Sequence, residues 1–435
     1  TGVQTCALRS LSLFQNMARR VPAYRDFLRK NGVRCDAITS MHDFVRLPLT
    51  SKENYLRAYP LSDLCWDGKL YDQPAVYAAT SGSTGEPFYF PRTHVQDEQF
   101  RFTLELLLRD FFMVDRRKTL FINCFALGIW IGGMYMYQAL KYLVDANEYA
   151  LTVITPGAYK EEALKAIKKF GNSFDQIVIG GYAPLVKDLI DDGERMGISW
   201  KKYYTRFFFA AEGFSEDFRD YMHRACGLSN PFISSFNHYG TADMGTMAHE
   251  TPVSIMLRRL SAEHATLRDK LFIDPSKQPT LCQFLPELFF FEQIDNGLVC
   301  SSGSGLPLIR YDLKDVGGVL STDKISNAIQ EEGMNWDISI EQLGLRDYYW
   351  HVPYVYVYER RDLTVSIYSV NIYPESIRRV LERPAFAQEI TTKFSLKVTY
   401  DEHQNQIFEI HVERKNGVMD TEDLRVRLQK EIIDQ

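Results

Sequence analysis

The residues best suited to chemistry in this sequence form one short loop, Thr80-Ser81-Gly82-Ser83-Thr84-Gly85-Glu86-Pro87. Its four hydroxyl residues are interleaved with two glycines, so backbone N–H and side-chain O–H groups can converge on one anionic ligand. The loop lacks the Gly-Lys-Ser/Thr ending of a Walker loop, and its serines lack the flanking glycines of a hydrolase nucleophile elbow. We therefore predict a phosphate-binding loop of another kind. The alternative is a flexible Ser/Gly-rich surface turn.

Alternating strands and helices must hold this loop in place. Apolar runs typical of buried strands lie at Ala75–Tyr77, Leu120–Phe125, Leu151–Ile154, Gln176–Ile179 and Arg206–Ala210. Charged helical stretches such as Lys160–Phe170 and Ala183–Met196 separate some of them. This alternation predicts an α/β fold, with a large N-terminal body of mixed or parallel sheets covered by helices. Shorter strands from Leu281 to Val319 predict an additional small β-rich part.

The last part of the chain has a different pattern. Phe394–Tyr400 and Ile407–Glu413 flank a polar turn, and the second run alternates apolar and polar side chains, which predicts a β-hairpin. A helix follows, with a cap at Asp420 or Thr421 and one apolar face. We therefore predict two domains, a body of residues 1–358 and a small α+β lid of residues 359–435.

Composition narrows the class of protein. The 435 residues are 45% hydrophobic and 24% charged, which is the balance of a globular protein, and the formal net charge is −6. This charge argues against nucleic-acid binding by bulk electrostatics. Seven scattered cysteines without a CxxC pair fit a reducing cytoplasm better than a disulfide framework. We expect a cytoplasmic protein without a signal peptide.

One segment has the length of a membrane span. Thr119–Leu140 contains 22 residues without a charge. Asn123, Gly128 and the pair Gly132-Gly133 interrupt it, which favours a buried strand, a loop and a helix over a span. We therefore expect no membrane span. The alternative, an integral membrane protein, would depend on detergent.

The loop sequence TSGSTGEP resembles the phosphate-binding loop of the adenylate-forming superfamily, which includes acyl-CoA synthetases, peptide-synthetase adenylation domains and luciferases. The text LPLTSKEN at Leu47–Asn54, followed by Tyr59-Pro60, resembles the phenylacetate–CoA ligase-like branch. The resemblance runs from about Asn16 to the end of the chain. It implies an AMP-binding body with a C-terminal lid, and ATP, Mg²⁺ and coenzyme A as ligands.

Three further segments match motifs of this family. Tyr239-Gly240-Thr241-Ala242-Asp243 resembles its tyrosine–glycine–x–threonine–glutamate motif, which implies that the tyrosine stacks on adenine and the acid holds Mg²⁺. Pro307–Asp315 is similar to LPLIRYRTGD, which implies that Asp315 accepts hydrogen bonds from the ribose hydroxyls. Ala210-Ala211-Glu212-Gly213 aligns with Gly-Ala-Glu-Pro, whose backbone frames the adenine. The respective alternatives are a plain loop, an edge-strand salt bridge and a strand-to-helix turn.

The junction between body and lid carries two more candidates. Glu359-Arg360-Arg361-Asp362 and the later Ser369–Pro374 resemble the family's GRxD and GVNVFP segments. The match implies that Arg360 contacts ribose or phosphate and that Asp362 is the hinge of the lid. Glu359 and Ser369 replace glycines of the family pattern, and the Ser369 side chain would narrow the passage for a pantetheine arm.

The resemblance also implies a pocket for the acyl group beyond the α-phosphate. We expect Trp130, Gly132, Gly133, Tyr182 and His238 to line it, with the two glycines allowing close approach. Bulky aromatic residues favour an aryl or medium acyl acid. The alternative is that these aromatic residues belong to the core.

The implied reaction is ATP-dependent activation of a carboxylic acid. The acid attacks the α-phosphate of Mg–ATP, giving acyl-adenylate and pyrophosphate, with Thr84, Asp243 and Arg360 as the catalytic residues. A thiol, coenzyme A first, then displaces AMP, and a protein thiol or an amine is the alternative acceptor. The family's terminal lysine loop has no counterpart in the 75 residues after Arg360, which predicts that the chain is truncated or has lost this group. The second hypothesis is therefore a nucleotide-binding module without turnover. A homodimer is compatible with the sequence.

Overall fold

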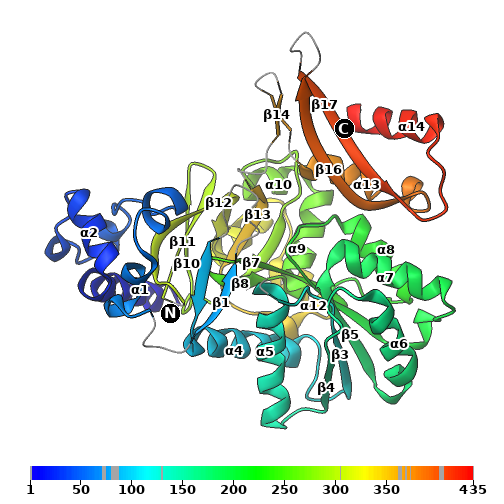
Figure 1. Ribbon diagram of the computed structural model, residues 1–435, viewed down its shortest axis with the longest axis horizontal. Coiled ribbons are helices and arrows are strands. Elements are labelled where there is room, and N and C mark those ends of the chain that lie inside the picture. The colour runs from blue at the N-terminus through cyan, green and yellow to red at the C-terminus, as the bar shows by residue number, and fades with distance from the viewer. Residues whose placement is uncertain are drawn as a thin grey trace.

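The computed structural model describes residues 2–70, 75–79, 88–128, 131–303, 305–360, 365–367, 370–372, 374–400 and 406–434 (Figure 1). The helices are α1 (Gly2–Arg20), α2 (Pro22–Lys30), α3 (Met41–Phe44), α4 (His94–Asp110), α5 (Ile131–Ala146), α6 (Lys160–Phe170), α7 (Ala183–Arg195), α8 (Glu216–Cys226), α9 (Pro252–Glu263), α10 (Ala265–Leu271), α11 (Thr322–Glu331), α12 (Trp336–Gln342), α13 (Pro374–Leu381) and α14 (Glu422–Ile433). The strands are β1 (Val76–Ala79), β2 (Tyr89–Arg92), β3 (Thr119–Asn123), β4 (Leu151–Ile154), β5 (Gln176–Tyr182), β6 (Thr205–Ala210), β7 (Ser235–Thr241), β8 (Gly245–His249), β9 (Thr280–Gln283), β10 (Phe290–Ile294), β11 (Gly297–Ser302), β12 (Leu308–Leu320), β13 (Tyr354–Arg360), β14 (Val365–Ile367), β15 (Val370–Ile372), β16 (Ile390–Tyr400) and β17 (Gln406–Arg414).

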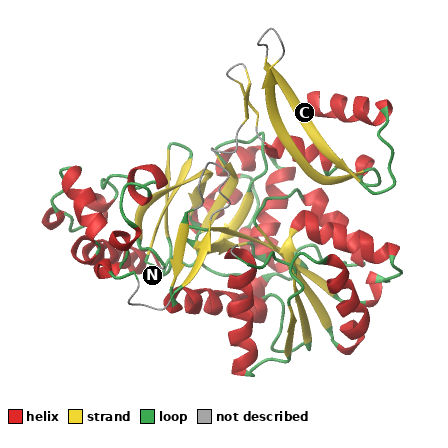
Figure 2. Ribbon diagram, in the orientation of Figure 1, coloured by secondary structure: helices red, strands yellow, loops and turns green. Residues whose placement is uncertain are grey.

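The largest sheet in the described residues has 11 strands in the order β10-β11-β12-β13-β9-β8-β7-β6-β5-β3-β4 (Figure 2). Strands β4, β3, β5, β6 and β7 pair in parallel, whereas the strands from β7 through β8 and β9 to β10 pair antiparallel. The predicted α/β fold is confirmed. The predicted β-rich part continues the same sheet instead of forming a separate one.

Helices cover both faces of the parallel half of the sheet. Successive strand residues point to opposite faces, so Ile177 and Ile179 join a cluster with α6, α7 and α8. Val178 and Phe208 instead join a cluster with α4 and α5. Because both faces are buried, these strands are apolar at consecutive positions, which is why the sequence shows them as runs.

The uncharged segment Thr119–Leu140 forms a strand, a loop and a helix, as predicted. β3 ends at Asn123, and α5 begins at Ile131. A Cβ on Gly133 would lie 2.1 Å from the Ala126 carbonyl oxygen, so this glycine lets the loop cross the first turn of the helix. No helix in the described part of the chain is long and apolar enough to cross a membrane.

The C-terminal unit, residues 374–400 and 406–434, has its own hydrophobic cluster around Ile377, Phe386 and Leu424. β16 and β17 form the predicted hairpin, and the Thr421 hydroxyl caps α14 by accepting from the Leu424 N–H at 3.3 Å. In Figure 1 this unit, orange to red, lies beside α7, α8 and α9. β13 of the large sheet runs to Arg360. The predicted division into two domains near residue 358 stays a prediction.

A buried cluster of charges lies under the strands that carry the candidate site. Arg219 of α8 donates to both carboxylate oxygens of Glu250 at 2.8 Å, and neither side chain is exposed to solvent. Arg219 and Arg258 also pair with Glu216 at 3.0 and 2.6 Å. Burial alone would raise the pKa of Glu216, but Arg219, Arg258 and Arg259 overcome it and hold this pKa at about 2. The cluster therefore joins α8, α9 and the residue that follows β8.

Two buried histidines should make the stability of the fold depend on pH. Burial lowers the pKa of His249 to about 3, and burial followed by Arg219 and Arg259 lowers that of His223 to about 3. The unfolded chain binds these protons near pH 6.5, so the free energy of unfolding should fall as pH falls from about 6.5. Each histidine should contribute about 1.4 kcal/mol per pH unit below that point. Urea unfolding at pH 7, 6 and 5 measures the slope.

His249→Phe is the matched variant, because the His249 ring packs against Trp350 and Phe111 and accepts no hydrogen bond from the described residues. Its slope should be shallower than that of the wild type by about 1.4 kcal/mol per pH unit. Equal slopes in the two proteins would show that His249 is not held neutral by the fold.

Candidate functional site

Two reciprocal tyrosine–aspartate hydrogen bonds join the β7–β8 hairpin to β12. The Tyr239 hydroxyl donates to Asp315 Oδ2 at 2.5 Å, and the Tyr311 hydroxyl donates to Asp243 Oδ2 at 2.5 Å. In each pair the tyrosine comes from one element and the aspartate from the other. Both bonds are short, as expected when a hydroxyl donates to a carboxylate. The fold thus brings together three of the predicted site residues, Tyr239, Asp243 and Asp315.

Asp315 lies in the interior of the sheet. It is 3% exposed, and β12 pairs with β11 on one side and β13 on the other, which excludes the edge-strand alternative. Its register partner on β13 is Arg360. The backbone of the predicted ribose- or phosphate-binding arginine therefore lies directly across from the predicted ribose-binding aspartate. The side chain of Arg360 lies outside the described residues, so the contacts of both with a nucleotide stay predictions.

The β7–β8 turn depends on two glycines. A Cβ on Gly240 would lie 2.6 Å from the Gly245 carbonyl oxygen, so the strands can approach only because this residue has no side chain. Gly245 has φ +80°, a conformation that favours glycine. The Thr241 hydroxyl accepts from the Met244 N–H at 3.2 Å and closes the turn. Gly240 and Thr241 thus have a structural role in holding Tyr239 and Asp243, and their predicted nucleotide contacts remain untested.

An N-terminal segment adds to β12 and explains why two distant motifs occur together. Thr50, in the LPLT motif, forms a parallel bridge to Tyr311. Its N–H donates to the Arg310 carbonyl at 3.0 Å, and its own carbonyl accepts from Asp312 at 2.9 Å. Arg310 has φ +46°, and its guanidinium pairs with Glu292 at 3.0 Å and donates to the Leu47 carbonyl. This clamp fixes the part of β12 from which Tyr311 projects.

The predicted adenine-framing segment is a loop after β6. Ala211 has φ +80°, which is unusual for a residue other than glycine and is typical of functional loops. Asn237 of β7 donates from its side chain to the Glu212 carbonyl at 3.0 Å. The Glu212 carboxylate forms an ion pair with Arg378 of α13. The loop therefore contacts both β7 and the C-terminal unit.

The residues predicted for the acyl pocket lie near the carboxyl ends of the parallel strands. Tyr182 of β5 is in register with Ala210 of β6, and Ala210 is in register with His238 of β7. Ligands of α/β sheets bind at such strand ends. His238, however, is 6% exposed and stacks on Phe208 at a centroid distance of 3.7 Å. Neither of its ring nitrogens has a hydrogen-bond partner in the described residues, and burial lowers its pKa well below the usual value.

His238 is thus packed as a core side chain, and its place in a substrate pocket stays a prediction. The places of Gly132 and Gly133 in the pocket also stay predictions. Gly132 is exposed at the start of α5, and the packing of Gly133 against Ala126 already requires a glycine. The other predicted site residues, Thr80, Ser81, Gly82, Ser83, Thr84, Gly85, Trp130 and Asp362, lie outside the described residues.

The predicted Mg²⁺ site rests on one carboxylate. In the described part of the chain no group of three or more His, Cys, Asp or Glu side chains is arranged to hold a metal ion. Mg²⁺ beside a nucleotide needs only one or two carboxylates, because substrate phosphates and water complete its shell. Asp243, half-buried and oriented by Tyr311, fits that requirement.

Three residues of the site were missed in the sequence. Tyr311 lies in the LPLIRYDLKD motif, and its aromatic hydroxyl four residues before Asp315 was an available signal. Asn237 lies two residues before Tyr239 and could also have been suspected. Arg378 lies on a helix with no motif, so its pairing with Glu212 could only be seen in the fold.

Comparisons with known proteins support the fold. No protein-family model and no curated protein sequence matches the chain. A solved structure of 2-hydroxyisobutyryl-CoA ligase in the postadenylation state is similar, with 14% identity, a TM-score of 0.68, and coverage of 98% of this chain and 82% of that one. An acyl acid amido synthetase matches with 13% identity, a TM-score of 0.56, and coverage of 99% and 82%. An anthranilate CoA ligase in complex with anthranoyl-AMP matches with 11% identity, a TM-score of 0.51, and coverage of 82% and 60%.

The chain therefore has the adenylate-forming fold that these CoA ligases and the amido synthetase share. This is the fold that the sequence motifs predicted. At 11–14% identity the likeness establishes the architecture, and the chemistry must be argued from the site.

The Tyr311–Asp243 hydrogen bond can be tested by removing one atom. Tyr311 is 2% exposed, and Tyr311→Phe should lower the free energy of unfolding by about 1–2 kcal/mol, because a hydrogen bond to a charged group is lost from a half-buried aspartate. Tyr159→Phe is the control, since Tyr159 is 76% exposed. Urea unfolding of the three proteins measures the difference. Equal stability of the two variants would show that the bond contributes nothing.

Proposed function

We propose that this protein activates a carboxylic acid as an acyl-adenylate and transfers the acyl group to a thiol, with coenzyme A as the acceptor. The observation that carries the proposal is the crossed pair of hydrogen bonds, Tyr239 to Asp315 and Tyr311 to Asp243. It places an aromatic face and two carboxylates together beside the strand ends of an adenylate-forming fold. The similar 2-hydroxyisobutyryl-CoA ligase was solved with an acyl-AMP and with coenzyme A, which supports this assignment.

Each described residue has a distinct part in the proposed chemistry. Asp315, buried on β12 and in register with Arg360 of β13, would accept hydrogen bonds from the ribose hydroxyls. Tyr239 is held by its hydroxyl, which fixes the plane of the ring for contact with adenine. Asp243 would hold Mg²⁺, which lowers the cost of charge on the α-phosphate. The loop Thr80–Gly85 would bind the phosphates, and Arg360 would contact ribose or phosphate.

The substrate carboxylate would then attack the α-phosphorus in line with the departing pyrophosphate. Its own oxygen forms the new bond, and the bond to the β-phosphate oxygen breaks. No proton needs to move in this half-reaction, so the protein contributes by positioning and by neutralising charge. The thiol of coenzyme A displaces AMP in the second half-reaction.

The arrangement of the C-terminal unit supports the first half-reaction. Two structures of 2-hydroxyisobutyryl-CoA ligase in the postadenylation state match with TM-scores of 0.68 and 0.67. Its structure in the thioesterification state matches with a TM-score of 0.60. We infer that the chain is arranged here for adenylation. An aryl or medium acyl substrate, the phenylacetate–CoA ligase-like branch, a body–lid division near residue 358 and a cytoplasmic location belong to the same proposal.

A nucleotide-binding module without turnover is the second candidate. Ala242 and Asp243 replace the threonine and glutamate of the family motif, and Glu359 and Ser369 replace glycines. These departures favour binding over catalysis.

Acid-dependent exchange of labelled pyrophosphate into ATP separates the two candidates. With a panel of aryl and medium-chain acids, we expect exchange with at least one acid. Asp315→Asn should lower kcat/KM by about 30-fold or more, because the charged acceptor for the ribose hydroxyls is lost. Asp269→Asn, at an exposed position of α10, is the matched control and should not change it.

Binding of AMP measured by calorimetry completes the test. AMP binding without exchange for any acid would favour the nucleotide-binding module over the ligase. If the protein shows no AMP binding and no pyrophosphate exchange, both candidate functions are overturned.

A further inference from the structure

Two of the contacts between the C-terminal unit and the body differ in character. At the first, α13 and the residue that follows it meet the loop after β6. Arg378 pairs with Glu212, and these side chains are 8% and 24% exposed. Glu382 accepts from the Ser215 hydroxyl at 2.7 Å and from the Ser215 N–H at 3.3 Å, at the N-terminal end of α8. Both body residues belong to the segment 211–215, which contains the predicted adenine-framing residues.

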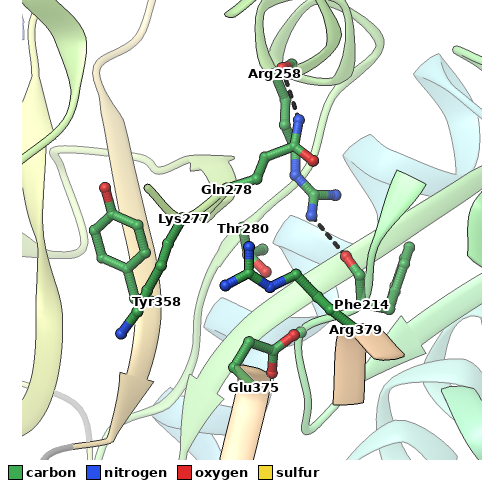
Figure 3. A pocket seen from close by; sticks show the side chains of 9 residues that line it. Phe214, Arg258, Lys277, Gln278, Thr280, Tyr358, Glu375 and Arg379 are labelled. Atoms are coloured by element: carbon green, nitrogen blue, oxygen red, sulfur yellow. Dashed lines mark hydrogen bonds between the residues drawn. The ribbon is translucent and has the colours of Figure 1, made fainter. Parts of the chain in front are cut away.

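This segment is held firmly on the body side. Asn237 holds the Glu212 carbonyl, and the Asn237 N–H donates to the buried Glu250 carboxylate at 2.8 Å. Arg258 donates to the Phe214 carbonyl at 2.6 Å. Figure 3 shows Arg379 and Glu375 of α13 lining a small pocket together with Arg258 and Phe214. The loop and α13 therefore meet through few, well-defined contacts.

The second place is remote from that loop in the sequence and has a different partner. Lys393 of β16 pairs with Asp188 at 2.7 Å, and Lys415 pairs with Asp191 at 2.9 Å, both on α7. Asp191 also accepts from Lys187 at 2.9 Å and from the Tyr221 hydroxyl at 2.5 Å. None of these residues was predicted to contact a nucleotide. The α7 contact can therefore serve as an internal control.

We propose that Arg378 is a positioning residue that couples nucleotide occupancy of the 211–215 loop to docking of α13. The inference rests on the proposed function, because the loop is taken to frame adenine. A nucleotide that fixes the Ala211–Glu212 backbone also fixes the direction of the Glu212 carboxylate, which strengthens its pairing with Arg378. By thermodynamic linkage, docking of α13 strengthens nucleotide binding by the same factor.

Amide hydrogen exchange of residues 374–381, with and without AMP, tests the coupling directly. In the wild type, AMP should slow exchange of this helix by about fivefold or more, within the range typical of coupled sites. Arg378→Gln should lose that response. Lys415→Gln should exchange faster in both states, because docking on α7 is weaker, yet it should keep the AMP-dependent slowing.

AMP affinity measures the same coupling from the side of the nucleotide. Arg378→Gln and Glu212→Gln should each weaken AMP binding by about fivefold, and the double variant should be no weaker than either. Circular dichroism of each variant checks that it is folded. Additive losses would mean that the two residues do not act as a pair.

The outcomes separate the inference from the function on which it rests. If the wild type does not bind AMP, the proposed function and the coupling both fall. If AMP binds but Arg378→Gln keeps the slowing, or behaves like Lys415→Gln, the coupling is overturned and the proposed function stands.

Discussion

The buried pair of Arg219 and Glu250 is the constraint on which the candidate site depends. Two charges without solvent exposure persist only when every donor and acceptor is matched, and loss of one partner leaves an uncompensated buried charge. Here the matching groups belong to the site: Arg219 donates to the Ser235 carbonyl at 2.7 Å, and Glu250 accepts from the Asn237 N–H at 2.8 Å. The register of β7, and hence the position of Tyr239, follows from the need to satisfy these charges.

The crossed tyrosine–aspartate hydrogen bonds connect β7, which these charges hold in register, to the other half of the sheet. β7 and β12 are separated in the sheet by β8, β9 and β13, so backbone pairing alone does not join them. Tyr239 and Tyr311 span this gap through their side chains. A carboxylate already held by a phenol hydroxyl loses little further freedom when a ligand arrives, which is the physical meaning of a preorganised site.

Much of the fold could be predicted because its signals are local. Apolar runs predicted β3 to β6 to within a few residues, and the hydroxyl of Thr421 indicated the start of α14. The glycines within Thr119–Leu140 indicated that this segment is not one continuous helix. The antiparallel continuation through β9, β13 and β12 could not be predicted, because pairing between residues 280 and 357 leaves no mark on either segment alone. The packing of His238 could not be predicted for a related reason. Strand residues alternate between faces, and only the full sheet shows that this one faces Phe208 in the core.

The contact between the body and the C-terminal unit is polar, whereas the interior of each of the two parts is apolar. The hydrophobic cluster of the unit is drawn from its own residues and Ile372, whereas its described links to the body include the polar side chains Arg378, Arg379, Glu382, Lys393 and Lys415. Polar groups that separate regain their hydrogen bonds from water, so such a contact can form and release without exposing an apolar core. An apolar contact of the same area would hold the unit in one place, because separation would expose that area to water at a far higher cost in free energy. A polar contact therefore suits the proposed two-step reaction on one bound acyl group, because each step needs different groups at the same carbonyl.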